Sequence, residues 1–161
     1  MKPLFQHALG AALLLAGAGA MAAPLATVTF ANPTSFSDVP DTTTEREEVF
    51  KELGDHFGRL AAKLPAGQEL TVEVLDLDLA GRVYPARYSA RDLRILKGAA
   101  DWPQIKMRYT ISEGGKVVRQ GEERLSDMNY LNRHNRYRGD ETLRYEKLML
   151  DDWFRERIVA R

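Results

Sequence analysis

The sequence TEREEVFKELGDHFGRLAAKL at residues 44–64 decides the fold class, because it predicts a long helix with one apolar face. Thr44 and Glu47 have the spacing of a capping box at its start, and Pro65 ends it. The apolar residues recur every three or four positions, as they do on one side of an amphipathic helix: Val49, Phe50, Leu53, Phe57, Leu60, Ala61 and Leu64. We therefore expect this helix to pack on a hydrophobic core.

Two segments that flank this helix alternate between apolar and polar residues, which is typical of strands. The alternation is regular over residues 25–31. In residues 70–79 it changes phase, since the apolar positions are even-numbered up to Val74 and odd-numbered from Leu75 onward. A β-bulge near Val74 would produce such a change.

A β-hairpin is expected over residues 104–125. Residues 104–111 alternate strictly, Gly114 and Gly115 suit the positive backbone angles of a tight turn, and residues 116–125 return as the partner strand. A shorter strand is expected over residues 92–97, and the apolar side chains that it should turn inward are Leu93 and Ile95.

A second amphipathic helix is expected over residues 141–159, and its apolar positions include Leu150, Trp153 and Phe154. The order of elements is strand, helix, several antiparallel strands and helix. This order predicts an α+β fold, namely a two-layer sandwich in which two amphipathic helices cover a mostly antiparallel sheet.

The N-terminus has the pattern of a secretory signal peptide. Lys2 precedes an apolar run over residues 8–20, and Ala20-Met21-Ala22 fits the small-x-small cleavage rule. The run is shorter than the roughly 20 residues that a spanning helix needs, so no transmembrane segment is expected after cleavage. We predict a leader over residues 1–22 and a single periplasmic domain over residues 23–161.

Composition excludes several classes of function. The chain has no cysteine, which rules out disulfides, thiol catalysis and a lipoprotein anchor. It carries 23 basic and 23 acidic residues, so its net charge gives no reason to expect a nucleic-acid partner. Only His56 and His134 lie beyond the leader, too few for a multi-histidine zinc site. We expect no metal and no cofactor.

Several short motifs occur in order over nearly the whole mature chain: LPAGQ at 64–68, DLDLAG at 76–81, DWP at 101–103, GEERLSDMNYL at 121–131 and LDDWF at 150–154. In these motifs and in their order, the chain resembles the bacterial family catalogued as domain of unknown function 3016. The resemblance implies a small exported bacterial protein. It brings no assigned activity, cofactor or partner, so no functional residue can be transferred from the family.

Asp76 and Asp78 are the first candidate site residues, because positions two apart on a strand share a face. Paired carboxylates can hold a hard cation or share acid–base chemistry. The spacing of a calcium loop is missing, however. Pairing with Arg82 or with a neighbouring strand is therefore the favoured interpretation.

The densest polar cluster lies where the second hairpin strand runs into the loop before the last helix, and comprises Glu122, Glu123, Asp127 and Asn129. Strand ends and loops often carry function, so these residues are candidates for a ligand site or a catalytic site. The alternative is that Ser126 or Asp127 caps a short turn. This alternative is favoured, because capping is a common role for such residues.

Two hypotheses for function remain. The preferred one is a non-enzymatic envelope module that binds a protein partner or an anionic envelope component through the basic segments at residues 82–97 and 133–138, the second of which includes Arg133 and Arg136. The alternative is a carboxylate-dependent, hydrolase-like enzyme that uses the cluster from Glu122 to Asn129, with Glu123 or Asp127 as general acid or base. No catalytic residue is assigned.

Overall fold

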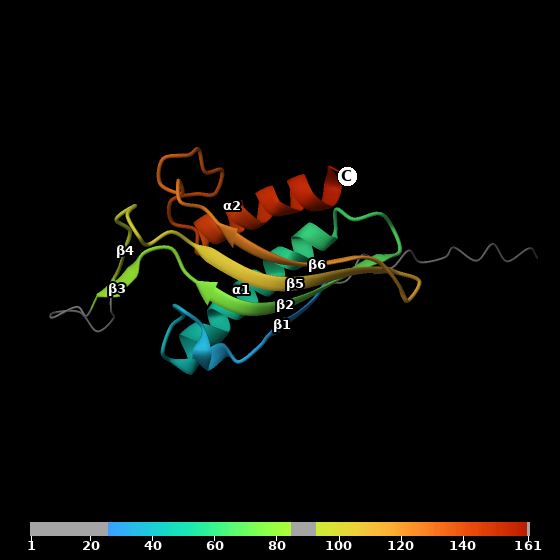
Figure 1. The fold of residues 1–161 in the computed structure, drawn as a ribbon. Coiled ribbons are helices and arrows are strands. Elements are labelled where there is room, and N and C mark those ends of the chain that lie inside the picture. The colour runs from blue at the N-terminus through green and yellow to red at the C-terminus, as the bar shows by residue number, and fades with distance from the viewer. Residues whose placement is uncertain (1–25, 85–92, 161) are drawn as a thin grey trace, which may run out of the picture.

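The computed structural model describes residues 26–84 and 93–160 (Figure 1). No helix in these two ranges is both long enough and apolar enough to cross a bilayer. The elements in chain order are β1 (Ala26–Phe30), the 3-10 helix η1 (Pro33–Ser35), α1 (Thr43–Ala61), β2 (Gln68–Asp78), β3 (Arg82–Tyr84), β4 (Leu93–Ile95), β5 (Gln104–Glu113), β6 (Lys116–Ser126), α2 (Arg144–Trp153) and the π-helical segment η2 (Phe154–Val159).

Four strands form the main sheet, in the order β1-β2-β5-β6. β1 pairs in parallel with β2, because α1 carries the chain back between them, and the other neighbours are antiparallel. β3 and β4 form a separate two-stranded ribbon. The predicted α+β class, with a mostly antiparallel sheet and two helices, is confirmed.

The core contains buried side chains from α1, α2 and two strands of the main sheet, β2 and β5, and partly buried side chains of β1 and β6 pack against it. Phe57 of α1 and Tyr109 of β5 both meet the Trp153 ring of α2 edge to face, at centroid distances of 6.4 and 5.3 Å. Burying side chains of this size contributes roughly 1.5–3 kcal/mol each. The residues predicted to face inward on the first helix and on the hairpin strand do so.

The N-cap of α1 is Thr42, two residues before the predicted cap Thr44. The hydroxyl of Thr42 accepts a hydrogen bond from the backbone N–H of Glu45 and donates to the Glu45 carboxylate, at 3.4 and 2.7 Å. Thr44 and Glu47 therefore do not form the cap. Both pairs have the same spacing in a run of three threonines, so the sequence alone does not decide between them.

The pairing of β2 with β5 and the pairing of β5 with β6 each contain one β-bulge. The register of β2 against β5 shifts between Val74 and Asp76, which confirms the bulge predicted from the change of phase. A second bulge lies between β5 and β6. There Ile111 pairs with Arg119 and Ser112 with Val117, which leaves Val118 without a partner.

The second helix starts at Arg144 rather than at the predicted Glu141, because Leu143 has a left-handed backbone with φ of 52°. A helix cannot continue through such a residue. At Phe154 the α-helical pattern gives way to the π-helical segment η2, which the periodicity did not predict.

The prediction for the short strand was partly wrong. β4 exists, but Leu93 and Ile95 are 55% and 40% exposed. Arg94, between them, is the residue that turns toward the domain, where it donates to Asp38 at 2.6 and 3.2 Å. Asp92, the predicted start of the strand, lies outside the described residues.

Candidate functional site

Asp76 and Asp78 lie near one another, beside a small cavity of about 170 Å³. Asp76 accepts hydrogen bonds from the N–H and the hydroxyl of Ser37, both at 2.8 Å. Asp78 accepts from Arg82 at 2.9 Å and from Gln104 at 3.3 Å. Both carboxylates therefore tie neighbouring segments together, and the pairing of Asp78 with Arg82 matches the favoured prediction.

The predicted polar cluster does not come together as one site. Glu122 pairs with Lys106 and Arg108. The hydrogen bond from Lys106 has the larger effect on the pKa of Glu122 and that from Arg108 the smaller, and both lower it. Glu123 lies opposite the core residue Met107 and so points to the other face of the sheet. The two carboxylates cannot act together on one ligand.

Asp127 and Asn129 form a turn at the end of β6, as the alternative interpretation predicted. The Asp127 carboxylate accepts from the N–H of Asn129 at 3.1 Å and from Arg133 at 3.0 Å. The same arginine also pairs with Asp152 of α2. These contacts hold the loop that leads to α2.

A buried polar cluster, which the sequence did not suggest, surrounds Asp151 of α2. The Oη of Tyr137 donates to Asp151, Arg136 pairs with it, and Nε2 of His56 lies 3.3 Å away at ion-pair distance, although without hydrogen-bond geometry. Burial alone would raise the pKa of Asp151, but His56, Tyr137 and Arg136 together lower it to about 2. Arg133 and Arg136, predicted as interaction residues, thus both have internal partners.

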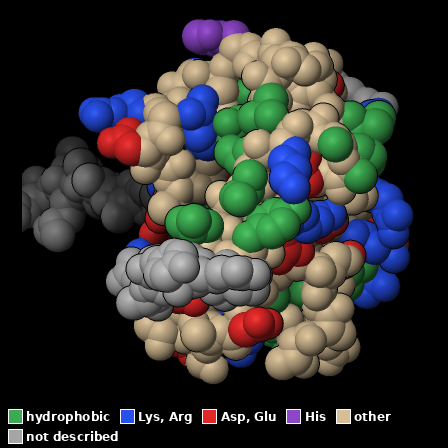
Figure 2. All heavy atoms as spheres, turned by 90° about the vertical axis from the view of Figure 1, so that its left-hand side faces the viewer, with side chains coloured by type: hydrophobic (Ala, Val, Ile, Leu, Met, Phe, Trp, Pro, Cys, Tyr) green, Lys and Arg blue, Asp and Glu red, His purple; other side chains and the backbone are tan. Residues whose placement is uncertain are grey.

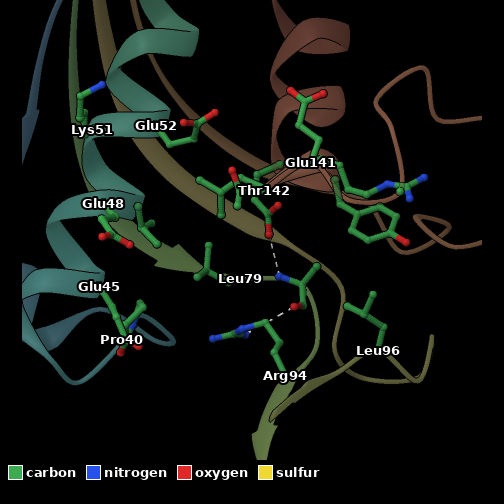
Figure 3. Close-up of a pocket in the computed structure, with 17 residues that line it drawn as sticks. Pro40, Glu45, Glu48, Lys51, Glu52, Leu79, Arg94, Leu96, Glu141 and Thr142 are labelled. Carbon is green, nitrogen blue, oxygen red and sulfur yellow. Dashed lines mark hydrogen bonds between the residues drawn. The ribbon is translucent and has the colours of Figure 1, made fainter. Parts of the chain in front are cut away.

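A cavity of about 690 Å³ lies between α1, the end of β2, the residues after β4 and the start of α2 (Figure 3). We call it the acidic pocket. It is within the range of about 300–1,000 Å³ that ligand sites occupy. Its apolar lining comes from segments far apart in sequence: Pro40, Val49, Leu79, Ala80, Leu96 and Leu143.

Carboxylates surround this apolar lining. Glu45, Glu48 and Glu52 are spaced by three and four residues, so α1 presents them on one side, and Figure 3 shows them along the helix beside the pocket. Glu52 and Glu141 both pair with Lys147, which is only 1% exposed, at 2.6 and 2.9 Å. Glu48 makes no ion pair with any residue that the structure describes.

Glu146 forms part of the pocket floor, where it joins α2 to the end of β2. Its Oε1 accepts from the N–H of Ala80 at 2.8 Å, and the carbonyl of Ala80 accepts from Arg94 (Figure 3). Burial raises the pKa of Glu146, against the opposing effect of the Ala80 N–H. The end of β2, the β3–β4 ribbon and α2 are therefore fixed to one another at the floor of the pocket.

Exposed hydrophobic side chains gather at the end of the molecule that carries β3 and β4, and Figure 2 shows them among charged groups. We call this set the apolar end. Exposed apolar patches of this kind often mark interaction surfaces. Its members are Val83, Tyr84, Leu93, Ile95, Leu96, Met128 and Leu131, of which Leu96 also lines the acidic pocket.

The acidic pocket combines polar and apolar side chains. Its polar lining has carboxylates, the ammonium group of Lys51, guanidinium groups, Thr142 and Tyr145. Residues 26–84 and 93–160 contain no group of three or more His, Cys, Asp or Glu side chains that would hold a metal ion. The geometry supplies recognition of charge and of apolar shape.

Comparison with known proteins identifies the family alone. No curated protein and no solved structure matches the chain. A family model described as "Protein of unknown function (DUF3016)" matches residues 25–156, which is most of the sequence and agrees with the resemblance seen in the short motifs. The chain therefore belongs to the DUF3016 family of proteins of unknown function.

Proposed function

We propose that the protein is a non-enzymatic binding module of the bacterial envelope, which holds a partner protein in the acidic pocket. The observation that carries this proposal is an open cavity of about 690 Å³ with apolar walls and a carboxylate rim, directly beside the apolar end. A concave apolar surface with a few polar groups that converge on it is the usual form of a binding site.

The chemistry of the pocket selects an apolar segment that carries lysine or arginine. Leu96, which is 40% exposed, and the partly buried Val49 and Leu143 offer surface to an apolar side chain. Glu48 offers a carboxylate without a cationic partner among the described residues, and Glu45 lies one turn away. Such complementarity gives specificity and a faster association rate.

The basic segments give less support to a binding role than this pocket does. Arg82 and Arg94 pair with Asp78 and Asp38, and Arg136 pairs with Asp151, so an anionic partner would have to compete with these internal carboxylates. Arg87 and Arg91, in the first basic segment, lie outside the described residues. The enzyme alternative is not favoured, because Glu122 and Glu123 face opposite sides of the sheet.

We also infer that the domain is a two-layer sandwich and that it works in the periplasm after loss of residues 1–22. The first inference is supported by the core that α1, α2 and the sheet share. The second is supported by the pattern of the leader.

The test is site-specific photocrosslinking in intact cells. A crosslinking amino acid at Leu96, in the pocket, should capture a partner through an apolar segment that contains Lys or Arg, as identified by peptide mass spectrometry. The same group at Val117, exposed at the far end of the sheet, is the matched control. Glu48→Lys should reduce capture at Leu96 without changing the melting temperature. The proposal would be contradicted if Leu96 and Val117 captured the partner equally, or if Glu48→Lys left capture at Leu96 unchanged.

A further inference from the structure

A second groove, of about 590 Å³, lies at the opposite end of the molecule from the ribbon. It is independent of the acidic pocket and of the function proposed for it. The segments that line it are the end of α1, the start of β2, the β5–β6 hairpin and η2, which Figure 1 shows near the C-terminus.

Two backbone irregularities build this groove. Val118 and Arg119 are neighbours in β6 and would point to opposite faces of a regular strand, yet both line the groove, because the bulge at Val118 turns the strand there. The π-helical segment brings Ile158 and Val159 to the opposite wall. Bulges and π-helical turns are both frequent at functional sites.

The charge of the groove is positive. Lys63 and Arg119 are the charged residues among those that line it, and no carboxylate is among them. Lys63 makes no ion pair with any residue in the described ranges, and Arg119 donates to the carbonyls of Arg157 and Ile158 at 2.7 and 3.0 Å. Glu113 lies at the side, where it accepts from Gln68. The charge of this groove is therefore opposite in sign to that of the acidic pocket.

We propose that this groove binds a single-chain anionic amphiphile, namely a free long-chain fatty carboxylate. The carboxylate group would lie between Lys63 and Arg119, whose guanidinium is already held in place by the two carbonyls. The hydrocarbon chain would lie along Val118 and Val159, which line the groove and are 52% and 58% exposed, over the more deeply buried Leu64, Ile111 and Ile158. Cationic groups beside an apolar wall select this charge and this shape together.

Isothermal titration of the purified protein with dodecanoate, kept below its micellar concentration, tests the proposal. Saturable binding is expected, and dodecyltrimethylammonium should not bind, because it has the same chain and the opposite charge. Lys63→Glu should weaken the affinity for dodecanoate by about tenfold, which corresponds to about 1.4 kcal/mol. Val118→Asp should weaken it as well, and both positions are exposed enough for the variants to keep the wild-type melting temperature.

Lys116→Glu is the matched control, since it makes the same charge change on the same end of the sheet but outside the groove lining. It should leave the affinity unchanged. The proposal is overturned if dodecanoate does not bind, if the cationic amphiphile binds equally well, or if Lys116→Glu weakens binding as much as Lys63→Glu does. Binding to anionic vesicles without binding of monomeric dodecanoate would also overturn it.

Discussion

Asp151 is a single buried carboxylate that joins α2 to α1 and to the loop after β6, through His56, Tyr137 and Arg136. Asp151→Asn removes the charge while keeping the shape of the side chain. Because the buried His56, the partly buried Tyr137 and the half-exposed Arg136 lose their charged partner, we expect a loss of about 3 kcal/mol in the free energy of unfolding, measured by urea denaturation. Asp140→Asn, which removes the carboxylate of the exposed Arg138 pair, should change it by less than about 1 kcal/mol. Equal losses in the two variants would argue against the special role of Asp151.

The lowered pKa of Asp151 also predicts how stability depends on pH. Its pKa is about 2 in the folded protein and 3.8 ordinarily, so the folded state favours the ionised form. The stabilisation is complete above the ordinary value and is lost as pH falls from about 4 toward 2. The stability difference between the wild type and Asp151→Asn should therefore shrink over that window in urea unfolding curves. If the stability difference between the two proteins stayed constant down to pH 2, folding would not lower the pKa of Asp151.

Glu146 predicts a pH effect of the opposite sign, because burial raises its pKa. The unfolded chain loses the proton near the ordinary value of 4.5, whereas the folded chain keeps it to higher pH. Glu146→Gln keeps an acceptor for the Ala80 N–H and removes the titration. Its stability relative to the wild type should rise as pH increases above about 4.5, as measured by thermal unfolding. A stability difference that is independent of pH would show that folding does not raise the pKa of Glu146.

At the scale of elements, the β3–β4 ribbon is attached to the main sheet by polar contacts rather than by an apolar core. Arg94 donates to Asp38, and Arg82 to Asp78. Asp38→Ala should therefore speed hydrogen exchange at the β3 and β4 amides and leave exchange in β5 unchanged. Asp55→Ala, which removes an exposed ion pair with Lys51 on α1, is the control and should leave the ribbon unaffected. Unchanged exchange in the ribbon of Asp38→Ala would show that other contacts hold it.

The elements also show which parts of the fold could be predicted from sequence. The first helix and the hairpin were predicted because their periodicity is long, and the bulge at Val74 because a change of phase is visible in the sequence. Leu143 gave no such signal, since a left-handed leucine is rare and depends on its surroundings. The inward direction of Leu93 was predicted wrongly, because alternation over three residues does not say which face meets the domain.

The candidate sites were harder to predict, for a physical reason. His56, Tyr137 and Asp151 meet only after the chain has folded, and nothing in their local sequence indicates the contact. The same holds for the acidic pocket, whose walls come from α1, β2 and the start of α2. By contrast, the pairing of Asp78 with Arg82 is local, four residues apart, and was predicted.

At the scale of the whole molecule, the signal-peptide proposal can be checked directly. The intact mass of the protein isolated from the periplasmic fraction should correspond to a chain that begins at Ala23. Ala22→Arg should block cleavage and shift the mass to that of the full 161 residues. Recovery of the wild-type protein with Met1 at its N-terminus would refute the proposal.

Under the proposal that residues 1–22 are a secretory leader, the parallel pairing of β1 has a consequence for export. Ala26 lies opposite Leu70, so the strand that follows the leader cannot find its neighbour until more than forty further residues have been synthesised. Pairings between residues so distant in sequence form slowly. The slow pairing of β1 with β2 keeps the first strand unpaired while the leader is engaged. The polypeptide therefore stays extended, as it must to cross a translocation channel.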